Sequence, residues 1–152
     1  MQRHMKVKAG LAAVAIAGGA AVATIGSASP ALGFFSPPLS LQITVDSPGT
    51  LVAGGAGVNV DVTVECAGTG SAGADVFLSL SERSGSQIAT GFGSTVVGCT
   101  NSKQTVVVLV TAQNGKAFKG GSAIANGSLS GCTPSFSVCG TESDQPTISI
   151  TH

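Results

Sequence analysis

The chain has 152 residues, and its seven basic and seven acidic side chains balance to a formal net charge of zero. Hydrophobic residues make up 43% of it, which argues against intrinsic disorder because disordered chains lack enough apolar surface to bury. From residue 29 onward four bases remain against seven acids, a net charge of −3. Such a chain has neither the basic patch that nucleic acid requires nor a polybasic patch for anionic lipid.

Residues 1–28 have the pattern of a secretory signal peptide. A basic start, MQRHMKVK, precedes the uncharged run AGLAAVAIAGGAAVATIG, and small residues follow. We predict cleavage after Ala28, with cleavage after Ala31 as the alternative. An uncleaved membrane anchor is a further interpretation, but the run is rich in Ala and Gly rather than Leu, which favours export. We therefore expect a secreted protein, extracellular or in the cell envelope, without stable membrane insertion after cleavage.

The next segment, residues 29–38, has the sequence SPALGFFSPP and is predicted to be a linker, because its prolines disfavour helix. Residues 39–152 are then long enough to form one domain with its own core.

Period-two alternation predicts seven strands in this domain. The clearest is VNVDVTVEC, in which Val58, Val60, Val62 and Val64 share one face. The segment TVVVLVTA is apolar on both faces and predicts a central strand. Gly-rich turns without helical periodicity favour a seven-stranded antiparallel immunoglobulin-like sandwich, an all-β fold, with a small barrel as the alternative. The predicted strands span 39–46, 57–66, 74–82, 87–98, 105–112, 121–131 and 146–151.

Several segments resemble a group of small secreted actinobacterial proteins of immunoglobulin-like type. They are SPGTLVAGG, VNVDVTVEC, LSLSERSGSQIATG, VVVLVTA and KAFKGGSAIA, together with the final cysteine pair. The resemblance covers nearly the whole chain after the signal, and it implies this fold and an exported location but no activity. A more distant fold similarity is to the neocarzinostatin-type apoproteins, which carry two short-range disulfides on a seven-stranded sandwich and bind an enediyne chromophore.

Four cysteines, an even number in an exported chain, predict two disulfides: Cys66, Cys99, Cys132 and Cys139. The first three end or follow strands that point to the same pole of an antiparallel sandwich, and the fourth lies in the next loop. In an immunoglobulin-like sheet the strand ending at Cys66 pairs with the strand that follows Cys99. This favours Cys66–Cys99 and leaves Cys132–Cys139, although the two other pairings are also compatible with four cysteines at one pole.

The residues required for catalysis or metal binding are not combined in this sequence. The domain's single histidine, His152, lies at the C-terminus, so no base is held by a third group. Asp61 and Glu65 lie on a polar strand face, and the chain has no Trp or Tyr to form a sugar platform. Glu142 and Asp144 lack the pattern of a calcium loop, and the cysteines lack zinc-site spacing. We predict no enzyme activity, no metal and no cofactor.

The candidate binding residues lie between the last two cysteines, in GCTPSFSVCG. Phe136 is flanked there by Ser135 and Ser137. A large aromatic is usually buried, but on a loop closed by a disulfide it also suits an exposed anchor with little entropy left to lose. We predict a secreted, non-enzymatic binding or interaction domain that uses the loops at the disulfide-bearing pole, with an unidentified protein or small ligand as partner. The alternatives are a structural cell-envelope protein without a discrete ligand and a small-molecule carrier of chromoprotein type.

Overall fold

The structure is a computed structural model and describes residues 38–69 and 73–152. The chain divides into two units, Met1–Gly33 and Phe34–His152, and every described residue belongs to the second. The predicted signal peptide, and the linker up to residue 37, lie outside the described residues. No helix in the described part of the chain is long and apolar enough to cross a membrane.

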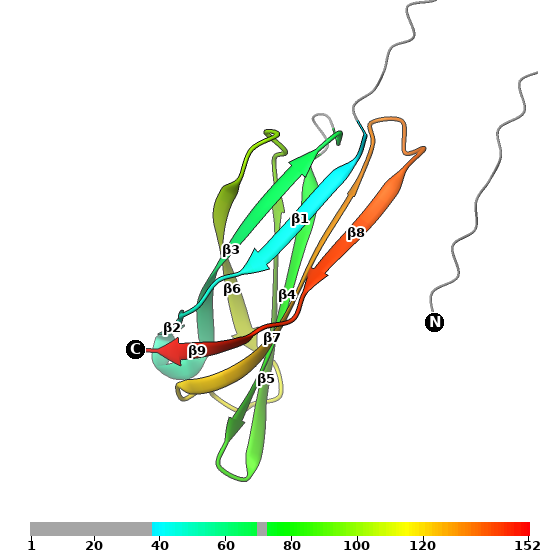
Figure 1. Cartoon of the computed structure of the whole chain (residues 1–152). Helices are drawn as coiled ribbons and strands as arrows, with labels where there is room; N and C mark the ends of the chain where they lie inside the picture. The colour runs from blue at the N-terminus through cyan, green and yellow to red at the C-terminus, as the bar shows by residue number, and fades with distance from the viewer. Residues whose placement is uncertain (1–37, 70–72) are drawn as a thin grey trace, which may run out of the picture. The chain divides into compact units, whose positions relative to one another are not determined.

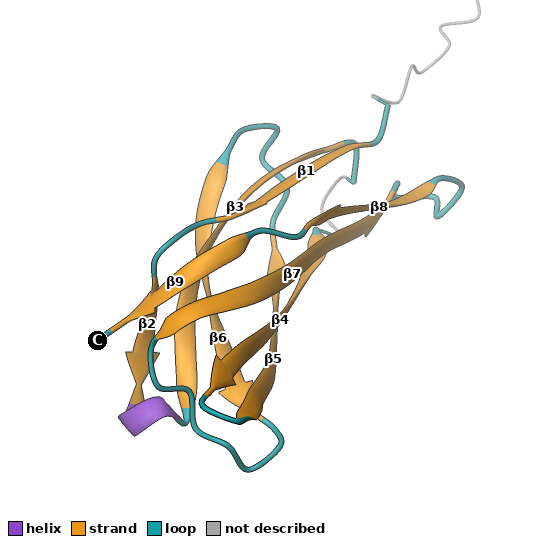
Figure 2. Cartoon of the chain, turned by 60° about the horizontal axis from the view of Figure 1, so that its bottom comes forward, coloured by secondary structure: helices purple, strands orange, loops and turns teal. Residues whose placement is uncertain are grey.

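The described domain consists of β-strands and one short 3-10 helix (Figures 1 and 2). All seven predicted strands are present, each within two residues of its expected ends, which confirms an all-β domain. Two short strands, β2 and β8, were not predicted. The elements are β1 (Ser40–Val45), β2 (Gly49–Val52), η1 (Ala53–Gly55), β3 (Gly57–Ala67), β4 (Ala74–Ser84), β5 (Gln87–Val97), β6 (Gln104–Ala112), β7 (Gly121–Cys132), β8 (Cys139–Asp144) and β9 (Thr147–Thr151).

Hydrogen bonding closes seven of these strands into a ring, in the order β3, β6, β5, β4, β7, β9, β2 and back to β3. Two links in the ring are short. β5 pairs with β6 through two residue pairs only, and β2 pairs with β9 through two. The β2–β9 pair is parallel, whereas the expected sheet was antiparallel throughout. Pro48 has no N–H to donate, so pairing along β3 is interrupted between β1 and β2, and β2 then also reaches β9.

β1 and β8 lie outside the ring, at the end of the domain that carries the disulfides (Figure 1). β1 pairs with β3 and β8 pairs with β7. Among the described residues no backbone ladder joins β1 to β8; instead the Val45 N–H donates to Asp144 Oδ2 at 2.8 Å. An acidic side chain on an edge strand discourages further strand pairing there.

Glycines in β7 and β8 explain how β1 packs without a ladder. A Cβ at Gly127 would lie 2.6 Å from Val45 Cγ2, and one at Gly140 would lie 3.5 Å from Leu41 Cδ1. The small residues of β7 and β8 therefore form the surface against which the aliphatic side chains of β1 lie.

Inward-facing aliphatic side chains of the ring fill the core. The loop between β6 and β7, residues 113–120, closes the end of the core that is opposite the disulfides. Phe118 is buried in that loop, and its N–H donates to Gly55 O at 2.9 Å. Glu82, only 1% exposed, accepts the Lys119 N–H at 2.9 Å through Oε2 and so fastens the same loop. The most deeply buried aliphatic residues include Val58, Val60, Val62, Val64, Val76, Leu78, Leu80, Val108, Val110 and Leu129.

Candidate functional site: the disulfide-closed turn

Two disulfides lie at the end of the domain where β3, β5 and β7 finish. Cys66 is bonded to Cys99 and Cys132 to Cys139, which is the pairing that we expected from the positions of the cysteines at the strand ends. The Asn101 N–H also donates to Cys66 O at 3.2 Å, which holds the loop after Cys99 against the end of β3. All four cysteines therefore gather at one pole, as expected.

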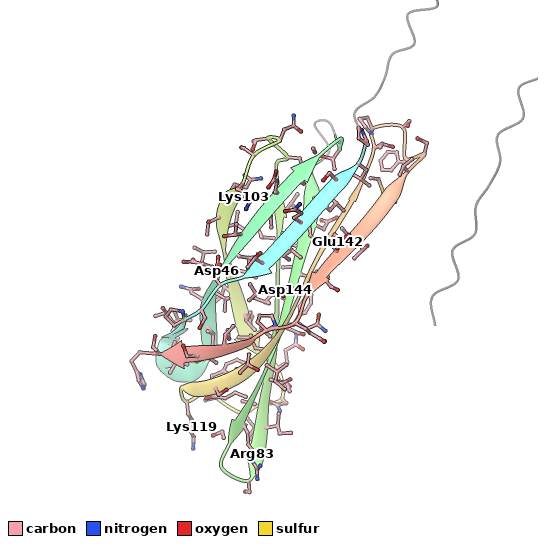
Figure 3. The ribbon with its side chains drawn as sticks, viewed as in Figure 1. Asp46, Arg83, Lys103, Lys119, Glu142 and Asp144 are labelled. Carbon is pink, nitrogen blue, oxygen red and sulfur yellow. A yellow bond between two sulfur atoms is a disulfide. The ribbon has the colours of Figure 1, made fainter. Side chains whose placement is uncertain are left out.

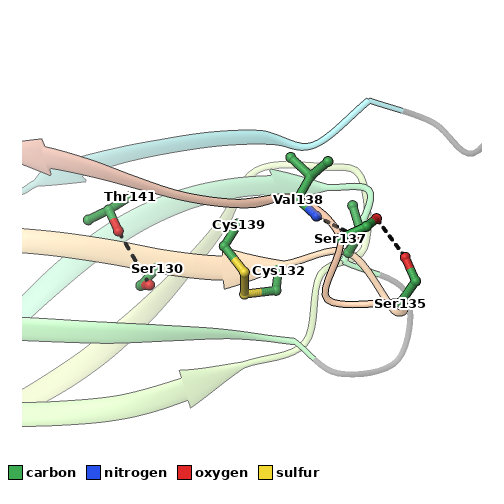
Figure 4. The surroundings of a disulfide bond; sticks show 8 residues. Ser130, Cys132, Ser135, Ser137, Val138, Cys139 and Thr141 are labelled. Atoms are coloured by element: carbon green, nitrogen blue, oxygen red, sulfur yellow. Dashed lines mark hydrogen bonds between the residues drawn. A yellow bond between two sulfur atoms is a disulfide. The ribbon is translucent and has the colours of Figure 1, made fainter.

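The second disulfide closes the turn between β7 and β8, residues 132–139 (Figure 4). Cys132 and Cys139 are directly opposite in the β7–β8 register. Inside them the Thr133 N–H donates to Val138 O at 2.8 Å, and the Phe136 N–H donates to Thr133 O at 2.8 Å. Pro134 occupies the second position of this four-residue turn, where its fixed φ is favoured. We call residues 132–139 the disulfide-closed turn.

Phe136 projects from the disulfide-closed turn into solvent with 74% of its side chain exposed. Its backbone φ is +55°, in the left-handed region that bulky L-residues rarely adopt and that glycine or asparagine usually fills. Both a buried and an exposed Phe136 were considered from the sequence, and in the structure the residue is exposed. Phe136 therefore reduces the stability of the fold in two ways: its backbone lies in a disfavoured region, and its apolar ring is exposed to water.

Ser135 and Ser137 lie on either side of Phe136 and bond to each other. Their hydroxyl oxygens are 2.7 Å apart, and the Ser137 hydroxyl is also 3.3 Å from Thr133 Oγ1 (Figure 4). Thr133 is buried, and its Oγ1 accepts the Val138 N–H at 3.2 Å. The serine hydroxyls thus stiffen the base from which Phe136 projects. Their direct contact with a ligand stays a prediction.

A surface hollow of about 470 Å³ lies beside the disulfide-closed turn. Pro38 and Leu39 line one side, and Pro134 and Val138 line the other. The Val138 side chain is exposed like that of Phe136. The sequence pattern did not single out these apolar neighbours, because Leu39 and Val138 are distant in sequence and meet only through the fold.

A second group of exposed apolar side chains lies on the outer face of β4, β5 and β6. The rings of Phe77 and Phe92 are stacked, with centroids 6.1 Å apart and 26° between their planes. Val107 and Leu109 are exposed on β6. The predicted central strand 105–112 is thus buried on one face only: Val108 and Val110 point inward.

The acidic residues considered for metal binding are not gathered into a site. Asp144 is bonded to the Val45 N–H, and Glu142 is exposed on β8. Within residues 38–69 and 73–152 no group of three or more His, Cys, Asp or Glu side chains is arranged to hold a metal ion.

Comparison with known proteins adds one distant structural similarity. No protein-family model matches the chain, and no curated protein is similar to it. A solved structure of AggA, the major subunit of aggregative adherence fimbriae type I from Escherichia coli, is similar at a TM-score of 0.38. The two are 15% identical, over 76% of this chain and 96% of that one.

Proposed function

We propose that the protein is a secreted, non-enzymatic interaction domain that binds a partner protein through the disulfide-closed turn. The observation that carries the proposal is Phe136, a large aromatic that is 74% exposed at φ +55°. A bulky residue in this conformation costs about 1–2 kcal/mol relative to its normal backbone region. Such local strain at an exposed position supports a functional contact, since the folded domain alone gains nothing from it.

The surroundings of Phe136 favour a protein partner. The ring protrudes from a turn that a disulfide and five hydrogen bonds already order, so little conformational entropy is lost on binding. A protruding aromatic with apolar neighbours fits a concave site on another protein, where aromatic anchors dominate the binding energy.

The architecture and location form part of the same proposal. Pairing of β3 with β6 and of β4 with β7 also occurs in an immunoglobulin-like sandwich, in which loops at one pole bind ligands, although here β4 also pairs with β5 along its whole length. The two disulfides suit an oxidising compartment and support export by the predicted signal in residues 1–28.

The test compares the wild-type protein with Phe136→Gly as bait for proteins from cell-envelope and host extracts. Glycine fits φ +55° without strain, so the variant keeps the turn and loses only the ring. A captured protein is identified by mass spectrometry and its affinity measured with both baits. We expect a loss of about 30-fold, the size of a hot-spot contact. Phe92→Ser, which removes a different exposed ring, is the control; equal affinity of wild type and Phe136→Gly would contradict the proposal.

A structural envelope role is the second candidate, and the apolar outer face of β4, β5 and β6 favours it. Exposed apolar groups on neighbouring strands are typical of surfaces that assemble with other copies. Sedimentation equilibrium of the wild type and of the double variant Phe92→Ser, Leu109→Ser tests this role. Self-association that the double variant abolishes would support it, and a monomeric wild type would count against it.

A further inference from the structure

A hollow of about 620 Å³ lies on the outer face of the sheet, at the opposite end of the domain from the disulfides. It spans the end of β4, the start of β5 and the first residues of β7, and Thr147 of β9 forms part of its rim. The volume is within the range of roughly 300–1,000 Å³ that is usual for sites that bind small molecules.

Cross-strand register places hydroxyl and aliphatic side chains side by side in this hollow. Thr147 is opposite Ile124, and Ile124 is opposite Ser81. On the next strand pair Arg83 is opposite Ile88. Ile88 and Ile124 are 58% and 61% exposed, so two aliphatic surfaces stand beside the hydroxyl groups and the cation.

Arg83 is the charged group of the hollow and lies near the tip of the β4–β5 hairpin (Figure 3). Its Nε donates to Gly85 O at 3.3 Å, and within the described residues no carboxylate pairs with it. The adjacent acid, Glu82, points into the core and bonds to the Lys119 N–H. A guanidinium has five N–H donors, so most of them are left for a ligand.

A row of hydroxyl groups continues beyond the hollow toward β9. A smaller depression of about 290 Å³ shares Ser122 and Thr147 with it and is also lined by Ser47 and Ser149. The Ser47 and Ser149 hydroxyl oxygens are 3.1 Å apart. The combined surface is a trough with hydroxyl groups along its length, two isoleucine faces and one arginine that pairs with no carboxylate of the described residues.

We propose that this trough binds a carboxylate-bearing sugar. The Arg83 guanidinium matches a carboxylate in a two-bonded arrangement, and serine and threonine hydroxyls both donate to and accept from sugar hydroxyls. Ile88 and Ile124 offer aliphatic faces to the C–H groups of the ring. An acidic peptide shares the carboxylate, but a peptide that binds as an added strand pairs with a sheet edge, whereas this trough lies on a sheet face. The site is separate from the disulfide-closed turn.

Nuclear magnetic resonance titration of the secreted protein tests the site. The probes are glucuronic acid and N-acetylneuraminic acid, with glucose, acetate and a hexaglutamate peptide as comparisons. The acidic sugars should shift the amide signals of Ser81, Arg83, Ile88, Ser122 and Ile124, with a dissociation constant on the order of 1 mM because no aromatic ring is available for stacking. Glucose and acetate should each bind at least tenfold more weakly. No shifts at these residues up to about 20 mM, or equal or tighter binding of glucose, acetate or hexaglutamate, would overturn the proposal.

Variants of Arg83 separate the carboxylate contact from general surface effects. Arg83 is exposed, so Arg83→Gln should fold normally and bind glucuronic acid at least about tenfold more weakly, as expected for loss of a charged hydrogen bond. Arg83→Lys should retain part of the affinity. Lys103→Gln removes an exposed cation at the opposite end of the domain and should change nothing (Figure 3). Unchanged affinity of Arg83→Gln would refute the assignment, and Phe136→Gly should leave sugar binding intact.

Discussion

Val45 and Asp144 are 99 residues apart in the sequence, yet the Val45 N–H donates to Asp144 Oδ2 at 2.8 Å. This bond fastens the end of β1 to the corner between β8 and β9, in the part of the domain where no backbone ladder joins β1 to β8.

Asp144→Ala should therefore destabilise the domain by about 1–3 kcal/mol, because a partly buried N–H loses a charged acceptor. Urea unfolding measures the change. Glu142→Ala, which removes an exposed acid from the same strand, is the control and should alter stability by no more than about 0.5 kcal/mol. Equal losses in the two variants would mean that the bond to Val45 contributes nothing specific.

Gly127→Ala should also destabilise the domain, by about 1–3 kcal/mol, because its new Cβ would lie 2.6 Å from Val45 Cγ2 and overpack the contact between β1 and β7. Gly98→Ala is the matched control: a Cβ there has no atom within 4 Å. Thermal unfolding followed by circular dichroism compares the two. A Gly127→Ala variant as stable as Gly98→Ala would contradict the packing described for β1.

Removing the disulfides should reveal unequal contributions. Cys66→Ser with Cys99→Ser opens a loop of sequence separation 33, and Cys132→Ser with Cys139→Ser opens one of separation 7. The loop-entropy relation gives losses of about 4 and about 2.5 kcal/mol. Urea unfolding of each double variant under non-reducing conditions measures them. A larger loss from the short loop would show that the disulfide at the disulfide-closed turn does more than restrict the unfolded chain.

Phe136→Gly should raise stability by about 1 kcal/mol, since it relieves the left-handed backbone of a bulky residue. Asn101→Gly is the comparison, because Asn101 has a similar φ of +58° but asparagine tolerates this region, so its gain should be smaller. Chemical unfolding of both variants provides the measurement. If Phe136→Gly were less stable than the wild type, the ring would be packing against the domain rather than awaiting a partner.

Glu82→Ala should loosen the loop that contains Phe118 and Lys119, because the Lys119 N–H loses its acceptor inside the domain. Hydrogen exchange at Phe118 and Lys119 should accelerate, while exchange in the middle of β3 should accelerate much less. Glu82→Gln keeps an acceptor oxygen and should preserve most of the protection. Unchanged exchange in Glu82→Ala would show that the loop is held by Phe118 alone.

Strand positions were predictable because they depend on local alternation. The valines of β3 share one face in the sequence, and all of them are buried in the structure. The same rule applied one step further would have found Glu82, which continues the inward phase of Leu78 and Leu80 and is buried with them. Its polar side chain obscured a pattern that was otherwise intact.

Features that depend on tertiary pairing could not be obtained from the sequence. β2 is only four residues long, and its parallel contact with β9 follows from where Pro48 interrupts the pairing along β3. The trough around Arg83 depends on register between β4, β5, β7 and β9. The sequence was compatible with both burial and exposure of Phe136. No local sequence pattern predicts its φ of +55°, which is what makes its exposure informative.

The parallel link between β2 and β9 has a mechanical consequence. β1 begins beside the disulfides, β2 continues in the same direction, and β9 runs parallel to β2 toward the C-terminus (Figure 1). Tension applied between Ser40 and Thr151 would pull β2 and β9 in opposite directions along their own axes. The contacts between them, with the bonds from Ser149 N–H to Ser47 Oγ and from Thr151 Oγ1 to Gly49 O, would then bear the load in shear and yield together. The domain is thus arranged to resist a force that pulls its first and last strands apart by their ends.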